Sequence, residues 1–255
     1  MATIRDILRS VPGVRWAAQR VRLQKAEAEL RLFASRSAEE RPNLCVKVED
    51  RCFYLNDKTS TTPFDAHYLY HTSWAARQLR FINPKEHVDI SSSLYFVGLA
   101  SAIVPITHYD YRPPEFEIDG VTCKAGDLMA LPFADDSVES LSCMHVIEHI
   151  GLGRYGDPLD PCGDQKAAAE LQRVLVPGGH FLFVTPVGRP RVCFNAHRIY
   201  SFEMVVNLFP GLKLEEWALV KDDPSGGLVP KPTSDVINAQ SYGCGCFRFS
   251  KPILA

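Results

Sequence analysis

Residues 124–150 read KAGDLMALPFADDSVESLSCMHVIEHI, a polar loop followed by an apolar run that ends in histidines and a glutamate. The run at 138–144 has the length and composition of a buried strand, and a second short apolar run, at 121–125, comes directly before the loop. Similar runs flank this stretch at residues 87–91, 105–110 and 179–185. Helical patterns alternate with them, which is typical of crossover units and predicts an α/β domain.

The helical patterns and two later extended runs complete the predicted sheet. Helices are expected near residues 65–80, 94–103, 114–118, 164–176 and 201–208. The extended runs cover 213–220 and 241–250, and the alternation in the second is typical of a strand inserted antiparallel at the edge of a sheet. The expected architecture is a mostly parallel, seven-stranded sheet with helices on both faces.

The N-terminal part of the chain differs from the rest in its charge. Residues 1–41 contain nine lysines and arginines against five aspartates and glutamates, with helical spacing of apolar residues and a break at Pro12–Gly13. We therefore expect a basic helical extension over 1–41 and one α/β domain over 42–255. The extension is either a solvated helix or a surface that docks to an anionic membrane or a partner enzyme.

Composition excludes several classes of protein. The formal net charge of −2 gives no general attraction to nucleic acid, and no apolar run reaches the roughly 18 to 20 residues that a membrane helix needs. The N-terminus lacks the features of a secretory signal, so we expect a cytoplasmic protein, with peripheral attachment to the inner membrane through the extension as the alternative. The eight cysteines form no CxxC pair and predict buried free thiols. His67 and His71 have helical spacing but no obvious third ligand, so no metal site is predicted there.

Several segments, taken in order, resemble class I S-adenosylmethionine-dependent methyltransferases over roughly residues 60–250. They are VDIS at 88–91, ITHYD at 106–110, the stretch at 124–150, and ELQRVLVPGGHFLFVTPVG at 170–188. The segments HIGLGRYGDPLDPCGD (149–164) and PVGRPRVCFNAHRIYS (186–201) resemble the DUF268 branch, which is associated with bacterial surface-polysaccharide biosynthesis. The resemblance implies a Rossmann-like class I fold, S-adenosyl-L-methionine as cofactor, and methyl transfer.

Two carboxylates lie where the resemblance implies contacts with the cofactor. Asp110 closes the second strand and would accept hydrogen bonds from the ribose hydroxyls, and Asp127 would receive the adenine amino group, with Leu128 beside the ring. His145 follows the fourth strand and is a further candidate for contact with the cofactor.

The turn after the first strand departs from the family pattern. The acidic residue is present as Asp89, but the three glycine positions that follow it in the family fall on Ser91, Ser93 and Tyr95. Either the backbone of Ser91, Ser92 and Ser93 still binds the methionine carboxylate, or the cofactor site is degenerate.

The segment after the fourth strand combines glycines and prolines with charged residues, which predicts a rigid loop at the wall of the active site. His149 is the candidate general base because a histidine can accept a proton at neutral pH, and Glu148 or Asp157 would orient it. The candidate substrate-binding residues are Arg154, Tyr155, Asp160, Asp164, Arg189, Arg191, Asn195 and His197. A Mg²⁺ ion held by His149, Asp157, Asp160 and Asp164 is an alternative, although the spacing matches no established metal loop.

Three functions remain open from the sequence. The leading hypothesis is an O-methyltransferase that modifies a sugar of a surface polysaccharide or of its nucleotide- or lipid-linked precursor. The second is another sugar-modifying or glycosyl transferase that uses a nucleotide where the cofactor would bind. The third is a non-catalytic protein that assembles a polysaccharide complex through residues 1–41. The serine turn favours the last two, and the pair Asp110 and Asp127 favours the first.

Overall fold

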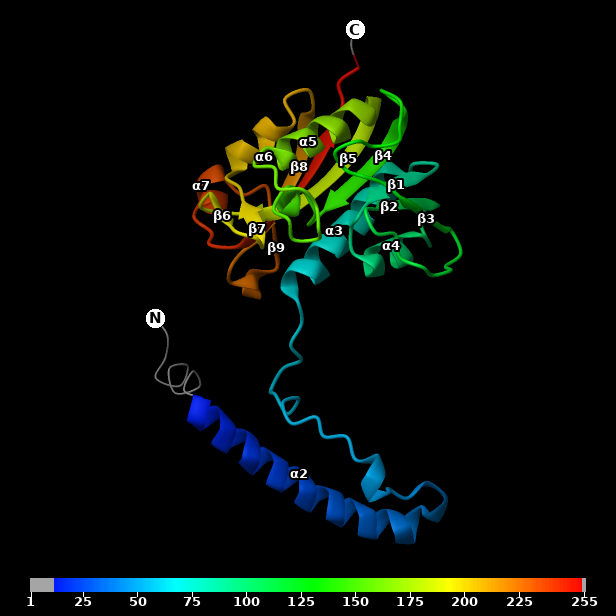
Figure 1. Ribbon diagram of the computed structural model, residues 1–255, viewed down its shortest axis with the longest axis vertical. Helices are drawn as coiled ribbons and strands as arrows, with labels where there is room; N and C mark the ends of the chain where they lie inside the picture. The colour runs from blue at the N-terminus through cyan, green and yellow to red at the C-terminus, as the bar shows by residue number, and fades with distance from the viewer. Residues whose placement is uncertain (1–11, 254–255) are drawn as a thin grey trace. The chain divides into compact units, whose positions relative to one another are not determined.

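A computed structural model describes residues 12–253, which divide after Phe64 into two compact units. The first unit contains the long helix α2 (Pro12–Glu40) and the short helical turns η1 (Pro42–Leu44) and η2 (Val48–Asp50), shown in blue in Figure 1. Lys58 returns to α2 and forms an ion pair with Glu29 at 2.8 Å. The division therefore falls later than the predicted boundary at residue 41: Val46, Asn56 and Lys58 each form a hydrogen bond with α2.

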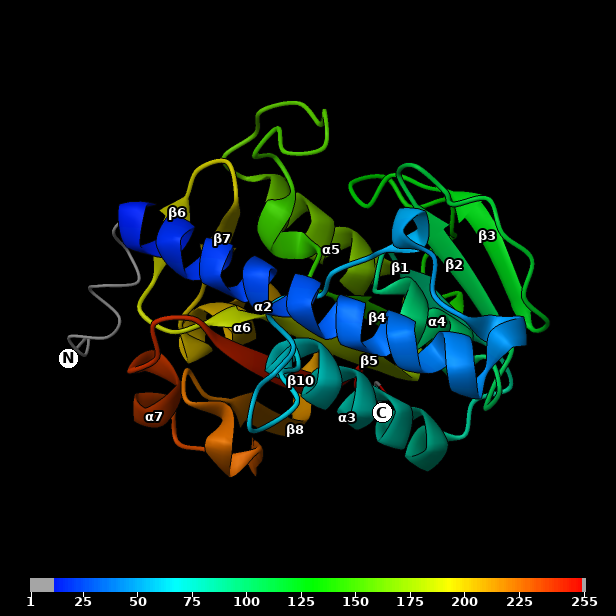
Figure 2. The ribbon, with the colours of Figure 1, turned by 90° about the horizontal axis from the view of Figure 1, so that it is seen from below.

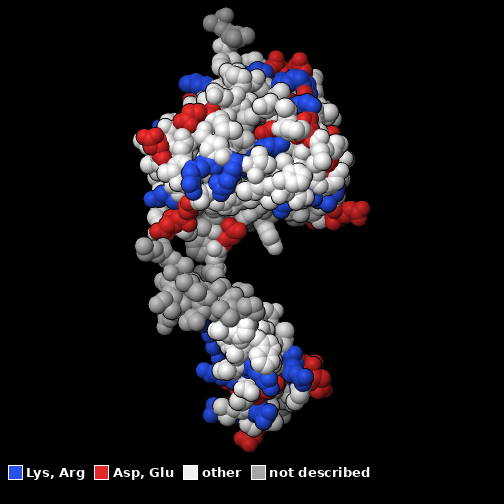
Figure 3. All heavy atoms as spheres, turned by 60° about the vertical axis from the view of Figure 1, so that its left-hand side comes forward, with Lys and Arg blue, Asp and Glu red and all other residues white. Residues whose placement is uncertain are grey.

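The helical spacing predicted before Pro12 lies outside the described residues. On the face of the first unit that is visible in Figure 3, basic side chains are interspersed with acidic ones. Within residues 12–253, no helix is both long enough and apolar enough to cross a membrane.

The second unit is built on an eight-stranded sheet with the order β3-β2-β1-β4-β5-β10-β8-β9. Its strands are β1 (His87–Ile90), β2 (Ile106–Asp110), β3 (Val121–Ala125), β4 (Val138–Met144), β5 (Leu175–Val187), β8 (Lys213–Val220), β9 (Leu228–Pro230) and β10 (Gly243–Ser250). Strands β1 to β5 are parallel, and β10 pairs antiparallel with both β5 and β8.

The helices cover both faces of this sheet (Figure 1, Figure 2). They are α3 (Ala66–Ile82), α4 (Leu94–Ala100), α5 (Gly163–Val174), α6 (Phe202–Leu208) and α7 (Ser234–Asn238), with turns η3 (Ile147–His149) and η4 (Pro224–Gly226) and a separate hairpin of β6 (Arg191–Cys193) and β7 (His197–Ile199). Alternate residues of β5 face opposite layers: Phe181 and Phe183 pack with α5 and α6, and Leu182 and Val184 pack with α3 and α4.

The α/β architecture and the mostly parallel sheet confirm the predicted fold class, with three corrections. The sheet has eight strands and not seven, because β9 forms where no strand was predicted. The last strand lies inside the sheet, between β5 and β8, and not at its edge. Residues 114–118 are not helical.

The cysteines also differ from the prediction. All eight are free, but only Cys143, Cys244 and Cys246 are buried, whereas Cys45, Cys52 and Cys162 are exposed. The two cysteines of β10 are two residues apart and therefore face the same layer of the core, beneath α3.

We predict that removing residues 1–64 leaves the α/β domain folded, because the described contacts of the sheet and its helices lie within residues 65–253. Thermal unfolding of the truncated and the full-length protein, followed by circular dichroism, should show the same cooperative transition within a few degrees. An insoluble truncated protein, or one without a transition, would place the first unit in the core of the domain.

Candidate active site

The turn after β1 replaces glycine with serine without losing the glycine conformation. Ser91 has a φ of 51°, in the left-handed region that glycine adopts most readily, and its N–H donates to the carbonyl of Tyr109 at 2.8 Å. A non-glycine residue pays about 1 to 2 kcal/mol for this conformation. The side chain of Tyr95, at the third glycine position, is 87% exposed, so it does not crowd the turn.

Asp89 holds this turn from beneath and does not line the cavity described below. Its fully buried carboxylate accepts hydrogen bonds from the Nδ1 atom of His108 at 2.8 Å, from the N–H of Ser92 at 3.1 Å, and from the hydroxyl of Ser142. Burial raises the pKa of Asp89, but the hydrogen bonds from His108, Ser142 and Ser92 outweigh burial and lower it below the usual value. Ser92 also accepts the N–H of Met144 at 3.1 Å, which fixes the turn to the end of β4.

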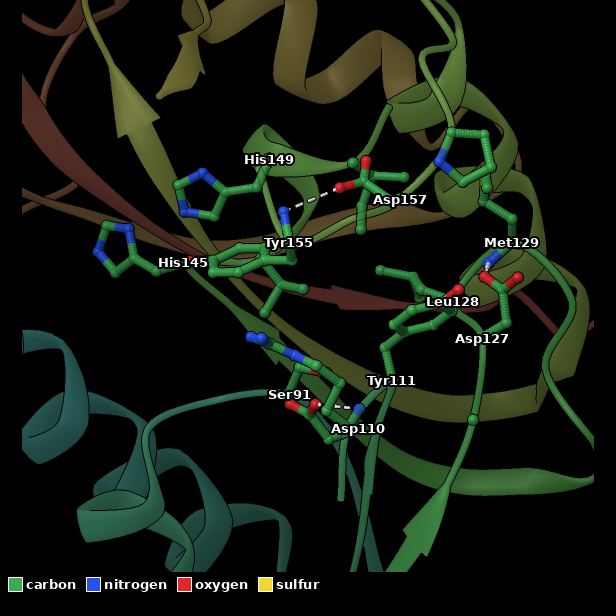
Figure 4. Close-up of a pocket in the computed structure, with 15 residues that line it drawn as sticks. Ser91, Asp110, Tyr111, Asp127, Leu128, Met129, His145, His149, Tyr155 and Asp157 are labelled. Carbon is green, nitrogen blue, oxygen red and sulfur yellow. Dashed lines mark hydrogen bonds between the residues drawn. The ribbon is translucent and has the colours of Figure 1, made fainter. Parts of the chain in front are cut away.

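A cavity of about 240 Å³ opens where β1 to β4 end, at the carboxyl edge of the sheet (Figure 4). Its lining residues are Ser91, Asp110, Tyr111, Arg112, Gly126, Asp127, Leu128, Met129, His145, Val146, His149, Ile150, Tyr155, Asp157 and Pro158. Ligands of open α/β sheets bind at this edge because the loops that follow parallel strands converge there. Ser92 and Ser93 do not belong to the lining; Ser93 precedes α4 as its N-cap residue without a side-chain capping bond.

Asp110 and Asp127 lie in this cavity with similar local structures. In each, the Oδ1 atom accepts a backbone N–H two residues later, from Arg112 and Met129 respectively, both at 2.8 Å. These bonds fix the carboxylates in tight turns and use one oxygen of each. Leu128, which is 5% exposed, forms an apolar part of the same wall.

His149 is oriented by a backbone carbonyl. Its Nδ1 atom donates to the carbonyl of Ala196 at 2.6 Å, so Nε2 is the free acceptor of the neutral ring, 3.8 Å from Oε1 of Glu148. Burial lowers the pKa of His149 below its usual value. The ring is therefore neutral at neutral pH and able to take up a proton at Nε2.

His145 lies next to His149 and is paired with the same glutamate. Its Nδ1 atom is 3.0 Å from Oε1 of Glu148, which is 1% exposed, and its Nε2 atom faces the sulfur of Cys244 at 3.5 Å. Burial lowers the pKa of His145, but the contacts with Cys244 and Glu148 outweigh burial and raise it above its usual value. Glu148 therefore contacts both histidines.

Asp157 has a different role from the predicted one. Its carboxylate accepts the backbone N–H groups of Gly151 at 2.8 Å, Gly153 at 3.2 Å and Tyr155 at 3.2 Å. The carboxylate of Asp157 therefore stabilises the conformation of the loop. His149 is oriented by the carbonyl of Ala196, which has the role that was predicted for Asp157.

The other acidic residues of the loop are also structural. Asp160 pairs with Lys166 at 2.6 Å and accepts the N–H of Cys162, and Asp164 accepts the hydroxyl of Tyr200 at 3.0 Å. Neither lines the cavity, and these carboxylates do not converge with Asp157 on one point. The arrangement therefore does not support the Mg²⁺ site considered from the sequence.

Arg198 holds the loop from the hairpin. Its guanidinium is 6% exposed and donates to the carbonyl of Ile150 at 2.6 Å and to those of Asp160 and Pro161, both at 3.4 Å. Gly151 allows the close approach of the two ends of the loop, because a Cβ atom there would lie 2.0 Å from the carbonyl oxygen of Asp160. The loop is therefore a fixed wall.

A second pocket, of about 390 Å³, adjoins the first across Tyr155. It is lined by Asp65, Ala66, His67, Tyr68, His145, Glu148, His149, Arg154, Tyr155 and Tyr242. The guanidinium groups of Arg112 and Arg154 each lie 5.1 Å from the ring centre of Tyr155. His145, His149 and Tyr155 line both pockets, so the two spaces share one wall.

The predicted residues of the hairpin lie outside both linings. Arg191 donates to the carbonyls of Ser241 at 2.8 Å and Arg189 at 3.0 Å, and Asn195 is exposed. The ring of His197 contacts that of Tyr242 at a tilted angle of 44°, with 4.9 Å between ring centres, and only Tyr242 of the two lines the second pocket.

The sequence analysis missed Tyr111, Arg112 and Tyr242. A signal was present for the first two, since they follow Asp110 directly at the end of a strand. Tyr242 reaches the pocket from the entry to β10, and nothing near it in the sequence indicates that position.

Comparisons with known proteins agree with this architecture. The family described as Caenorhabditis protein of unknown function, DUF268, matches residues 132–218, which include the loop and the hairpin. A candidate sarcosine dimethylglycine methyltransferase from Galdieria sulphuraria aligns with a TM-score of 0.53 and 14% identity, over 72% of this chain and 86% of that one. The fold is that of the methyltransferases.

Two further structures support the same conclusion about the fold. A complex of the Haloferax volcanii methyltransferase activator Trm112 with a candidate methyltransferase aligns with a TM-score of 0.51 and 19% identity, over 75% of this chain and 92% of that one. The YcgJ protein of Bacillus subtilis aligns with a TM-score of 0.50 and 17% identity, over 73% of this chain and 100% of that one. No functionally curated protein matches the sequence.

We predict that Asp157→Asn destabilises the protein, because an amide cannot accept all of the N–H groups that the carboxylate now accepts. The free energy of unfolding should fall by about 1 to 3 kcal/mol, the cost of leaving a polar group without its partner. Denaturant unfolding measures this value, and Asp119→Asn at an exposed position is the matched control. Equal stability of the two variants would contradict the structural role of Asp157.

Proposed function

We propose that the protein is an S-adenosyl-L-methionine-dependent O-methyltransferase that acts on a hydroxyl group of a sugar. The observation that carries the proposal is the cavity at the carboxyl edge of the sheet, where Ser91 in the glycine conformation, Asp110 and Asp127 face one space. The arrangement offers acceptors for hydroxyl and amino groups and an apolar wall at Leu128, which suits an adenosine.

The serine turn is compatible with this cofactor. Because Ser91 is left-handed and the side chain of Tyr95 points to solvent, the backbone keeps the form that the glycines would give it. The buried carboxylate of Asp89 holds the turn through Ser92. When bound, the cofactor supplies a methyl group that is open to attack by a nucleophile.

The second pocket is the proposed acceptor site, and His149 is the proposed base. Nδ1 of His149 is held by Ala196, so Nε2 is the atom that takes the proton from the acceptor hydroxyl. Burial keeps the ring neutral before the reaction, and Glu148 stabilises the charge that the ring then acquires. Tyr155 and the loop line the site, and correct positioning of the reactants supplies much of the acceleration.

A sugar acceptor is supported by the chemistry of the second pocket. The ring of Tyr155 provides an apolar face, and Arg154, His149 and Tyr242 surround it with polar groups that suit hydroxyls. The sugar would belong to a surface polysaccharide or to its nucleotide- or lipid-linked precursor. In the lipid-linked case, the basic segment 1–41 would hold the enzyme at the inner face of the membrane.

Titration calorimetry with S-adenosylmethionine, S-adenosylhomocysteine and a panel of nucleotide sugars tests the proposal. We expect saturable binding of both sulfur compounds. Binding of a nucleotide sugar without binding of either sulfur compound would replace methyl transfer by another sugar-modifying reaction. Binding of none of these ligands would favour a non-catalytic role.

For Asp110→Ala we expect the affinity for S-adenosylhomocysteine to fall by about 1 to 3 kcal/mol, the cost of leaving bound hydroxyls without their acceptor. Calorimetry on the variant and on Asp119→Ala, which removes an exposed carboxylate outside the cavity, gives the comparison. If both variants bind as the wild type does, Asp110 has no part in the site.

For His149→Asn we expect turnover to fall by about 10² to 10⁴-fold, the usual contribution of a general base, while binding of S-adenosylhomocysteine is unchanged. Asparagine can still donate to the carbonyl of Ala196, so the loop should stay in place. Burial lowers the pKa of His149 from 6.5. The turnover of the wild-type enzyme should therefore fall only below pH 6.5, where the ring becomes protonated. An unchanged rate per folded molecule in the variant would remove His149 from catalysis.

A further inference from the structure

We propose that His67, His145 and Cys244 bind a zinc ion in the wall of the second pocket. One ligand atom from each residue lies within 4.8 Å of the ligand atoms of the other two, and among residues 12–253 no other histidine, cysteine, aspartate or glutamate group comes together in this way. The residues come from α3, the end of β4 and the start of β10, so the fold and not local sequence assembles them.

The distance between Cys244 and His145 fits a shared ion. The Sγ atom of Cys244 lies 3.5 Å from Nε2 of His145. Bond lengths of about 2.3 Å for Zn–S and about 2.05 Å for Zn–N at a tetrahedral angle put sulfur and nitrogen about 3.6 Å apart. An ion could therefore bind between these two atoms with little movement of the backbone.

The ring of His145 already has an orientation suited to a metal. Its Nδ1 atom bonds to the buried carboxylate of Glu148 at 3.0 Å, which directs Nε2 toward Cys244. A histidine ligand held by a carboxylate in this manner is common in zinc sites, because the carboxylate orients the ring and makes it a better ligand.

His71 provides a second, independent observation. Its ring packs edge-on against His145 with 5.0 Å between ring centres, and its Nδ1 atom donates to the carbonyl of His67 at 2.7 Å. The Nε2 atom is therefore an unprotonated acceptor, and it is buried with no hydrogen-bond partner among the described residues. A buried lone pair of this kind is costly without a partner, and the positive charge of an ion bound to the neighbouring His145 would lower that cost.

An ion has access to the site. His67 is only partly buried and lines the second pocket, as does His145, so the ion can enter from that side while Cys244 closes the other. On binding, the Zn–S bond replaces the thiol S–H bond of Cys244, and its proton and any proton on Nε2 of His145 pass to solvent. With three protein ligands, the fourth position can hold water or an oxygen atom of a substrate.

The test uses the full-length protein, first stripped of metal with a chelator and then dialysed against zinc. We expect one zinc ion per chain by elemental analysis. Replacement by Co²⁺ should give visible bands of tetrahedral cobalt and a thiolate-to-metal charge-transfer band. If Cys244 and His145 form only a hydrogen bond, the protein will contain no stoichiometric metal and show no such bands. That result would overturn the proposal.

Variants identify the ligands. Cys244→Ala should abolish the charge-transfer band, whereas Cys143→Ala, at an equally buried position on β4, should keep it. His67→Gln, on the open side of the site, should weaken zinc binding with the least effect on folding. Glu148→Gln should lower the affinity by about 10 to 100-fold, as expected for a residue that orients a ligand. Unchanged zinc binding in both Cys244→Ala and His67→Gln would place the ion elsewhere.

The metal measurements are independent of the proposed methyl transfer. Zinc content and cobalt spectra need neither cofactor nor acceptor, and S-adenosylhomocysteine binding is measured separately. Zinc binding without cofactor binding would support the metal site and contradict the proposed methyl transfer. Cofactor binding without zinc binding would support methyl transfer and contradict the metal site.

Discussion

The buried carboxylate of Asp89 is the interaction on which the site depends. It joins the first strand to His108 on β2 and Ser142 on β4 and fixes the turn through Ser92, so one ionised group connects three neighbouring strands at the edge where the cavity opens. A charge in the core is tolerated only when hydrogen bonds replace the water that it has lost. Because those hydrogen bonds stabilise the turn, Ser91 can keep a conformation that its side chain disfavours.

In the loop after β4, residues that look alike in the sequence have two different roles: some stabilise the loop and others face the pockets. Its carboxylates satisfy backbone N–H groups, Lys166 and Tyr200, and Arg198 satisfies the carbonyls, so the charged residues mostly shape the wall. His149 and Tyr155 are then presented by a rigid frame. Rigidity of this kind matters for a base, since its reactive atom must stay in place without help from the substrate.

Sequence reasoning found the parts of the fold that depend on local pattern. The alternation of strands and helices predicted the sheet, and the resemblance to the methyltransferases pointed to Asp110 and Asp127, which both line the cavity at the carboxyl edge. It could not foresee that Asp157 would turn toward the backbone, because a carboxylate has the same sequence signature in either role. It also missed Cys244, whose neighbours His67 and His145 are distant in the chain and meet it only when α3 and β10 pack together.

The place of β10 in the sheet affects how the protein can fold while it is being synthesised. Among the strands of this sheet β10 is the last to be synthesised, yet it lies between β5 and β8 and carries Cys244 and Cys246 into the core. Until it is synthesised, β5 and β8 have no partner between them and their backbone groups remain open to other chains. The nascent sheet therefore stays incomplete until β10 has been made, and a chain that stops before β10 has a gap in the middle of the sheet instead of a shorter edge.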